Sequence, residues 1–133
     1  MIVDSSAIVA ILRQEPEGEA FVERVLDAER RAMSAVTLVE ASLVIEGRGG
    51  RAAGARLDRF LASANIEIVA VTADAARLAR EAWRVWGKGN HPARLNLGDC
   101  FSYALAQERD EPLLFKGEDF ARTDVTPALP ATS

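Results

Sequence analysis

Acidic side chains are the candidates for a reactive site in this 133-residue chain. Two carboxylates about 5 Å apart repel each other by roughly 3 kcal/mol at an effective dielectric of 20, so a fold that gathers several needs a compensating cation. Hard oxygen ligands suit Mg²⁺ or Mn²⁺, and a carboxylate-held divalent ion can activate water to attack a phosphodiester. Four acids stand where strands are predicted to end or helices to begin: Asp4, Glu40, Asp99 and Asp119.

Asp4 follows three apolar residues, Met1–Val3, which are typical of a buried strand. Two small hydroxyl residues, Ser5 and Ser6, come next, and the apolar run 7–12 predicts a helix. Because ligands of open α/β sheets bind beyond the carboxyl ends of the strands, Asp4 is well placed for a site. An acid here is also an ordinary helix cap, so Asp4 alone does not decide between the two roles.

The other three acids also allow both a structural and a chemical interpretation. Glu40 lies on the apolar face of a predicted helix, where a carboxylate either pairs with an arginine or binds a metal ion or water. Asp99 stands in the first turn of a predicted helix, where the helix dipole favours an acid. It can face a cleft, because the predicted core stripe of this helix is Leu97, Phe101, Ala104 and Leu105. Asp119 follows the last predicted strand.

Predicted strands alternate with predicted helices along the whole chain. The strands are apolar or β-branched runs at 1–3, 33–36, 66–71 and 112–115. Helical stripes lie between them, at 7–12, 19–28, 38–45, 51–64, 72–86 and 97–107. Thr37 is the predicted cap of the third helix, which we expect to stop at Gly47, Gly49 and Gly50. This alternation predicts an α/β fold with a mainly parallel sheet covered by helices on both faces.

Length and composition predict one domain over residues 1–133, with a loose tail rich in Pro and Ala from about residue 126. Hydrophobic residues make up 49% of the chain, enough for a core. No apolar run reaches the roughly 18 residues that a membrane helix needs, and no basic region precedes the first apolar stretch as in a signal peptide. We expect no membrane partner. The single cysteine, Cys100, can form no internal disulfide and suggests the reducing cytoplasm.

The charge and the scarcity of nucleophiles exclude some functions. A net charge of −4 argues against a protein that holds nucleic acid by a broad basic face, but not against a nuclease that uses metal ions and a few cations. We interpret Cys100, which stands beside Phe101, as a core residue. The chain has one histidine, His91, so Ser/His/Asp and Cys/His catalysis have little to work with. No Gly-rich phosphate loop of the Walker type is present.

Four segments together resemble the PIN-domain ribonucleases of the VapC type, the toxins of bacterial type II toxin–antitoxin systems. They occur in the family's order and span nearly the whole chain. The resemblance implies a PIN-like fold, a four- or five-stranded, mainly parallel sheet with flanking helices. The segments are Ile2-Val3-Asp4-Ser5-Ser6-Ala7, Leu38-Val39-Glu40-Ala41, Leu97-Gly98-Asp99-Cys100-Phe101 and Leu113-Leu114-Phe115-Lys116-Gly117-Glu118-Asp119-Phe120.

The resemblance also implies a Mg²⁺-dependent endoribonuclease that hydrolyses RNA by metal-activated water, leaving a 5′-phosphate and a 3′-hydroxyl; Mn²⁺ can substitute. It implies that Asp4 and Asp99 are the main metal ligands. Glu40 completes the metal site or positions water, and Ser6 orients the acids.

Asp119 is the fourth catalytic acid that the resemblance implies. Many relatives carry a further acid two positions before it, where this chain has Gly117. The second metal site of the family is therefore poorly supplied here, which makes operation with one metal ion plausible.

RNA, an antitoxin protein and a second copy of the chain are the expected partners. A free toxin would arrest its own host, so the resemblance implies a controlling antitoxin, whose amphipathic helix we expect in an apolar groove between the first two helices. We expect a homodimer because residues 51–64 and the helix with Trp83 and Trp86 carry more large apolar residues than a small domain easily buries. Candidate RNA phosphate contacts are Lys88, His91, Arg94 and Lys116.

Two other functions remain as alternatives. A signalling receiver domain is also a small acidic α/β protein that binds Mg²⁺, but it has adjacent acids after its first strand, whereas Ser5 and Ser6 follow Asp4 here. It also needs an acid after a central strand, and the predicted strand 66–71 ends without one. A phosphatase of the haloacid dehalogenase type is disfavoured by serine at position 6. The other alternative is a catalytically silent PIN binding module, against which the four intact acids argue.

Overall fold

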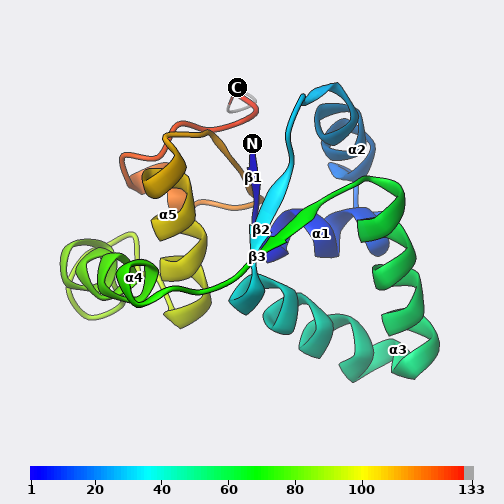
Figure 1. Ribbon diagram of the computed structural model, residues 1–133, viewed down its shortest axis with the longest axis horizontal. Coiled ribbons are helices and arrows are strands. Elements are labelled where there is room, and N and C mark those ends of the chain that lie inside the picture. Colours follow the sequence, from blue (N-terminus) through cyan, green and yellow to red (C-terminus); the bar gives the residue numbers. More distant parts are fainter. Residues whose placement is uncertain (131–133) are drawn as a thin grey trace.

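The computed structural model describes residues 1–130 and shows a parallel four-stranded sheet flanked by helices, which confirms the predicted α/β class (Figure 1). The strand order is β3-β2-β1-β4. The strands are β1 (Ile2–Val3), β2 (Ala32–Ser34), β3 (Glu67–Val69) and β4 (Leu113–Leu114). The helices are α1 (Ser5–Leu12), α2 (Gly18–Asp27), α3 (Ala35–Ser63), α4 (Ala73–Trp86), α5 (Leu97–Arg109) and the 3-10 helix η1 (Phe120–Arg122).

Strand β1 is one of the two central strands of the sheet, beside β2. Ile2 pairs with Ala32 of β2 on one side and with Leu113 of β4 on the other. All three are buried, as expected where helices cover both faces of a parallel sheet. Strand β3 lies at the edge of the sheet, is shorter than predicted, and leaves Ile68 38% exposed. The parallel direction brings the carboxyl ends of all strands to one edge, where Asp4 leaves β1.

The core has two parts, one on each face of the sheet. Figure 1 shows α1, α2 and α3 on one side of the strands and α4 and α5 on the other. The first part joins side chains of α1, α2 and α3 around Met33, and the second joins α4 and α5 around Leu95 and Leu113. Asp4 and the first turn of α1 therefore stand between two packed layers, which restricts their movement.

Side-chain caps start the helices at the carboxyl edge of the sheet. The Asp4 carboxylate accepts a hydrogen bond from the Ser6 backbone N–H at 3.0 Å, so Asp4 is indeed the cap of α1. Ser34, the last residue of β2, caps α3 by accepting from the Val36 N–H. The predicted cap, Thr37, was therefore wrong. It lies inside α3, because the helix begins directly where β2 ends, and it is fully buried.

A break at Gly50 divides α3. The helix was predicted to stop at the glycines Gly47, Gly49 and Gly50. It runs through the first two and breaks at Gly50, where φ is 68°, before continuing to Ser63. This left-handed conformation suits glycine, which has no β carbon to clash. Beyond the break, Leu57 and Leu61 pack into the core. The expectation that residues 51–64 expose a large apolar surface was therefore wrong.

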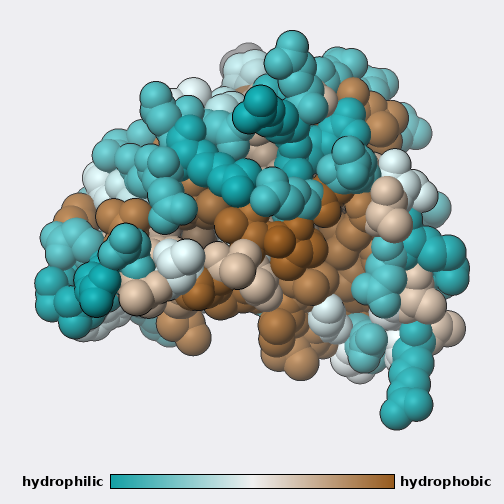
Figure 2. All heavy atoms as spheres, viewed as in Figure 1, coloured by the Kyte–Doolittle hydropathy of each residue, from teal (hydrophilic) through white to brown (hydrophobic). Residues whose placement is uncertain are grey.

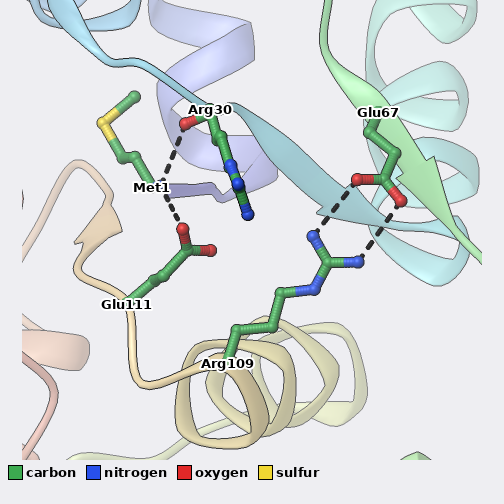
Figure 3. A network of polar contacts seen from close by, with 5 residues as sticks. All are labelled: Met1, Arg30, Glu67, Arg109 and Glu111. Atoms are coloured by element: carbon green, nitrogen blue, oxygen red, sulfur yellow. Dashed lines mark hydrogen bonds and ion pairs between the residues drawn. The ribbon is translucent and has the colours of Figure 1, made fainter.

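Ion pairs lie at the amino edge of the sheet (Figure 3). Asp4 lies at the opposite edge. The Met1 ammonium donates to the Arg30 carbonyl at 3.0 Å and to Glu111 Oε1 at 3.1 Å. Arg109 near the end of α5 donates both terminal nitrogens to the Glu67 carboxylate of β3. These contacts fix the end of α5 against the sheet, while its first turn reaches the opposite edge.

The described part of the tail pairs with β4, contrary to the expected looseness from residue 126. The Leu113 N–H donates to the Thr126 carbonyl at 2.9 Å, and the Ala128 N–H donates to the Leu113 carbonyl at 2.8 Å. Ala128 and Leu129 also pack against the core. Residues 131–133 lie outside the described part. Over residues 1–130, no helix combines the length and apolar character needed to cross a membrane.

Candidate functional site

Asp4 is the most firmly held of the four acids. Its side chain is 2% exposed. One carboxylate oxygen, Oδ2, accepts from both the backbone N–H and the hydroxyl of Ser6, at 3.0 and 2.7 Å. The other, Oδ1, accepts from the Ser102 hydroxyl at 2.6 Å. Three donors therefore fix the orientation of this carboxylate, although a carboxylate has about four acceptor positions and so keeps capacity for a further ligand.

A second hydroxyl stands behind Ser102. Ser102 Oγ and Thr37 Oγ1 are 3.1 Å apart, and both side chains are fully buried. Because the single hydroxyl proton of Ser102 points at Asp4, Thr37 must be the donor to Ser102. A chain of hydrogen bonds thus runs from Thr37 in α3 through Ser102 in α5 to Asp4. Sequence reasoning took Thr37 for a helix cap and assigned no role to Ser102, although Ser102 lies one helical turn after Asp99, on the same face.

Glu40 projects from α3 toward the start of α5. Its Oε1 accepts from the Ser5 hydroxyl at 2.6 Å, which ties it to the first turn of α1. Its other oxygen lies against Gly98, where the β carbon of any other residue would overlap the Glu40 carboxylate. Burial raises the pKa of Glu40, the Ser5 hydrogen bond opposes this rise, and the Asp4 charge adds to it. No arginine or lysine pairs with it within residues 1–130, so the first of the two alternatives for Glu40, a pair with an arginine, is not found there.

Asp99 lies in the first turn of α5, where it takes part in a capping box with Asn96. The Asn96 N–H donates to Asp99 Oδ2 at 3.0 Å, and the Asp99 N–H donates to the Asn96 side chain at 2.9 Å. Burial raises the pKa of Asp99 to about 7; the Asn96 hydrogen bond lowers it, whereas the charges of Asp4, Glu40 and Asp119 raise it further. Leu97 is 76% exposed, so its predicted place in the core stripe was wrong.

Asp119 and Ser6 connect the loop after β4 to the other acids. Asp119 is exposed, at the start of η1, and makes no capping hydrogen bond there. Its charge still raises the pKa of Asp99, which places it within electrostatic reach of that acid. The Ser6 hydroxyl accepts from the Lys116 backbone N–H at 3.0 Å while donating to Asp4. Ser6 therefore holds the ends of β1 and β4 together at the acid cluster.

These four carboxylates, Asp4, Glu40, Asp99 and Asp119, form an acid cluster without a counter-ion from the described chain. Over residues 1–130, no lysine or arginine makes an ion pair with any of them. A divalent cation fits this donor set, because it would offset the mutual repulsion that raises the Asp99 pKa and because carboxylate oxygens suit Mg²⁺. Within residues 1–130, no group of three acidic, histidine or cysteine side chains is already close enough together to bind one metal ion. A bound cation would therefore need some of these side chains to move closer together.

The predicted RNA contacts lie in different settings. The Lys116 ammonium already pairs with Glu15 at 2.7 Å and Glu17 at 3.3 Å, which offsets its charge. His91 accepts from the Ala93 N–H and meets the Trp86 ring edge-on at 4.8 Å, so it has a structural role in its loop.

Two other predicted RNA contacts, Lys88 and Arg94, are exposed in the loop between α4 and α5. Neither makes an ion pair within residues 1–130.

Cys100 is buried, and burial raises the pKa of its thiol to about 11, which favours the predicted core role over nucleophilic chemistry.

Large hydrophobic side chains are exposed on two of the helices, α3 and α4. Figure 2 shows them gathered across the middle and lower part of one face, below a hydrophilic upper part. Val39 and Leu43 of α3 are 56% and 71% exposed, one helical turn apart and on the same side of the helix. A second exposed group lies on α4: Leu78, Trp83 and Val85.

Comparison with known proteins agrees with this fold. Residues 1–125 match the PIN domain family. Ribonuclease VapC30 of Mycobacterium tuberculosis is 51% identical over 131 residues, 98% of this chain and 100% of that protein. Ribonuclease VapC of Mycolicibacterium smegmatis is 51% identical over 125 residues, 94% of this chain and 97% of that protein.

Solved structures show the same fold at lower identity. The Mycobacterium tuberculosis toxin VapC20, described as cleaving the sarcin–ricin loop, superposes with a TM-score of 0.76 at 18% identity, covering 94% of this chain and 95% of that one. A toxin–antitoxin complex from Klebsiella pneumoniae gives a TM-score of 0.69 at 18% identity and covers 92% of both chains. The family match spans nearly the whole chain and includes all four acids, which leaves no support for a receiver domain. This chain belongs to the PIN domain family.

Proposed function

We propose that this protein is a metal-dependent endoribonuclease and the toxin of a toxin–antitoxin pair. The observation that carries the proposal is the acid cluster: the charges of Asp4, Glu40 and Asp119, from three other segments, all raise the pKa of Asp99, and none of the four has a counter-ion among residues 1–130. Relatives that are 51% identical to this chain are named ribonucleases, which supports RNA cleavage as the reaction of this acid cluster.

Asp4, Asp99 and Glu40 are the proposed ligands of Mg²⁺, for which Mn²⁺ can substitute. When bound, such a cation lowers the pKa of water and offsets the charge that develops on a phosphate under attack. Ser6 and Ser102 hold the Asp4 carboxylate in one orientation. Asp99, whose pKa is raised to about 7, would hold the cation in its deprotonated form, so binding would displace its proton.

Glu40 is proposed to orient the attacking water, because Ser5 fixes one of its oxygens and leaves the other directed at Gly98 and the cluster. Asp119, exposed at the rim, is proposed as the fourth catalytic acid. Its position lets it move toward the cluster at no cost in buried hydrogen bonds.

RNA cleavage by the purified chain tests this proposal. We expect products with a 5′-phosphate in Mg²⁺ or Mn²⁺, and none in EDTA. Asp4→Asn and Asp99→Asn should lose cleavage, whereas Asp58→Asn, which changes an exposed acid on α3, should keep it. Undiminished cleavage in EDTA would refute the metal mechanism. No cleavage under any condition would favour the silent binding module.

The proposed antitoxin site lies between α1 and α2. A cavity of about 740 Å³ there has Ile11 and Val22 in its wall and three glutamates at its rim, Glu15, Glu19 and Glu23. The apolar groove is smaller than the sequence predicted, because Ile8, Phe21 and Val25 are buried in the core. A basic amphipathic helix would match this mixed surface, and a basic residue beyond it could pair with the acid cluster.

Co-expression from the native locus followed by pull-down tests the toxin assignment. A small partner should copurify, and removing its basic residue should weaken inhibition more than binding. If nothing copurifies and the chain alone leaves growth and RNA intact, the toxin proposal fails while the nuclease proposal can stand. The toxin and its antitoxin would act in the cytoplasm, where the antitoxin and the RNA substrate are made.

A homodimer is proposed through the exposed apolar ridge of α3, formed by Val39 and Leu43. Contiguous exposed apolar side chains of this kind often mark an interface. Light scattering should give a dimer mass at micromolar concentration, and Leu43→Glu should give a monomer. A monomeric wild-type protein would refute this proposal.

A further inference from the structure

A cavity of about 460 Å³ lies between α4 and the start of α5 and does not include the acids. Its wall is apolar, with Ala79 and Trp83 from α4, Leu95 from the loop, and Leu97 and Phe101 from α5. Three polar side chains also line it: Arg80, Lys88 and Asn96. An apolar pocket of a few hundred Å³ with a small number of polar groups is typical of a site for a compact organic group.

The cavity adjoins the acid cluster directly. Asn96 lines the cavity and is also the partner of Asp99 in the capping box, with an N–H to Oδ2 distance of 3.0 Å. Cys100 and Phe101, the next residues of α5, form part of the cavity wall. A group bound in the cavity would therefore lie next to the acid cluster, with Asn96 between it and Asp99.

Trp83 presents an aromatic surface to this cavity. Its side chain is 49% exposed, while its ring rests against Gly87, where a β carbon would overlap it. Over residues 1–130, its indole N–H makes no hydrogen bond and its ring pairs with no other aromatic ring. The nearby Trp86 differs, because it donates to Tyr103 and packs against His91. Trp83 therefore has both a face and a donor available to a ligand.

The two cations of the cavity are also available. On α4, Arg77 pairs with Asp74 and Arg84 pairs with Glu81, whereas Arg80 makes no ion pair within the described chain. Lys88 makes none there either. Two unpaired cations beside an acid cluster, in a chain of net charge −4, favour an anionic ligand over a second copy of the same chain.

We propose that this cavity binds one unpaired nucleobase of the RNA, next to the scissile phosphate. The base stacks on Trp83, Asn96 provides an amide for its polar edge, and Arg80 and Lys88 contact the flanking phosphates. Stacking of a base on an aromatic side chain is the usual way in which proteins hold single-stranded nucleic acid. This inference rests on the proposed ribonuclease function and names the determinant by which the same site selects its substrate.

Binding of short single-stranded oligoribonucleotides, measured by fluorescence anisotropy, tests the proposal. All variants carry Asp4→Asn so that the RNA is not cleaved. Trp83→Ala should bind about 5- to 150-fold more weakly, the range for losing one stacked base, and Trp83→Phe should retain most of the affinity. Arg80→Gln should reduce the salt dependence of binding by about one unit of slope. Its matched control, Arg84→Gln, removes the same charge from the same helix outside the cavity and should reduce it by much less.

Oligonucleotides with one abasic position distinguish a base from a phosphate. With Trp83 present, one abasic position should weaken binding more than the others, and Trp83→Ala should remove this dependence. The proposal is overturned if the wild-type chain cleaves RNA but no abasic position matters, or if the dependence survives Trp83→Ala. It is also overturned if Trp83→Ala only converts a dimer to a monomer. A wild-type chain that neither cleaves nor binds RNA refutes the proposed function itself.

Discussion

At the scale of single residues, buried hydroxyls determine how the acids are held. The chain from Thr37 through Ser102 ends on Asp4 Oδ1 and joins α3, α5 and the end of β1. Residues 98 positions apart make the Ser102–Asp4 bond. Local sequence patterns cannot predict such a bond, because it depends on how two helices pack. The positions of Asp4 and Asp99 were predictable, since Asp4 directly follows β1 and Asp99 lies in the first turn of α5. Glu40 lies further into α3 and was singled out only as a charge on an apolar helix face.

Ser102→Ala should weaken both the fold and the site. The substitution leaves the Asp4 oxygen without its donor and the Thr37 hydroxyl without its acceptor in a buried place, which costs about 1–3 kcal/mol of unfolding free energy. Loss of such a supporting bond also typically lowers metal affinity or activity by about 10- to 100-fold. Denaturant unfolding and Mn²⁺ titration measure the two effects.

Ser42→Ala is the matched control for Ser102→Ala. Its hydroxyl donates to the Leu38 carbonyl within α3 and has no bond to the acids. If Ser42→Ala and Ser102→Ala reduce Mn²⁺ affinity equally, the hydroxyl chain does not position Asp4.

Gly98→Ala should separate activity from stability. A β carbon at this position would displace the Glu40 carboxylate, whose flexible end can move without unfolding the protein. Alanine is also favoured over glycine within a helix by up to about 1 kcal/mol. We expect a melting temperature no lower than that of the wild type and a loss of RNA cleavage. Retained cleavage would show that Glu40 is not needed where the structure places it.

The pKa of Asp99 predicts how stability without metal depends on pH. Its folded-state pKa, about 7, lies above the unfolded value of 3.8, so the folded protein binds the extra proton between these values. Stability in EDTA should therefore fall as pH rises from about 4 to about 7, by at most about 4 kcal/mol from this residue, and change little above.

Thermal unfolding in EDTA at several pH values measures this fall in stability. The raised pKa of Glu40 should contribute a further fall in the same direction. Asp99→Asn should reduce the slope clearly. An unchanged slope would mean that Asp99 ionises normally in the folded protein. Because a cation competes with this proton, stabilisation by Mn²⁺ should increase as pH rises through about 7.

At the scale of elements, the alternation of strands and helices predicted the α/β class and the parallel sheet. Boundaries were less predictable, because β2 passes into α3 with no loop and Ser34 replaces Thr37 as the cap. The ends of β3 were also hard to predict, because none of its three residues is buried and no pattern of buried and exposed residues marks where this edge strand begins and ends. The first turn of α5 was placed correctly, but its capping box with Asn96 was not foreseen.

Two glycines of α3 should respond in opposite directions to alanine. Gly50 has a φ of 68° and a ψ of −169°, a conformation nearly restricted to glycine, and no atoms near an added β carbon, so Gly50→Ala tests backbone strain alone and should cost about 1–3 kcal/mol. Gly47 is helical with equally open surroundings, so Gly47→Ala should stabilise by up to about 1 kcal/mol. Chemical denaturation measures both values. Equal effects would show that the break at Gly50 is absent in solution.

At the scale of the whole molecule, the fold brings negative charge to one edge of the sheet and leaves it without a counter-ion from residues 1–130. Repulsion among the acids should therefore cost stability until a cation binds. Asp4→Asn should relieve part of it, and its hydrogen bonds can be kept, because the amide can donate to Ser102 if the two hydroxyls reverse their direction.

Thermal unfolding of the wild type, Asp4→Asn and the control Asp58→Asn, with Mn²⁺ and with EDTA, tests most directly whether the acid cluster holds the catalytic cation. In EDTA, Asp4→Asn should melt no lower than the wild type. With Mn²⁺, the wild type and Asp58→Asn should gain stability, by about 4 kcal/mol at 1,000 times the dissociation constant, and Asp4→Asn should lose most of this gain. If Asp4→Asn instead unfolds readily in EDTA yet gains fully from Mn²⁺, then Asp4 is only a helix cap and the metal site lies elsewhere.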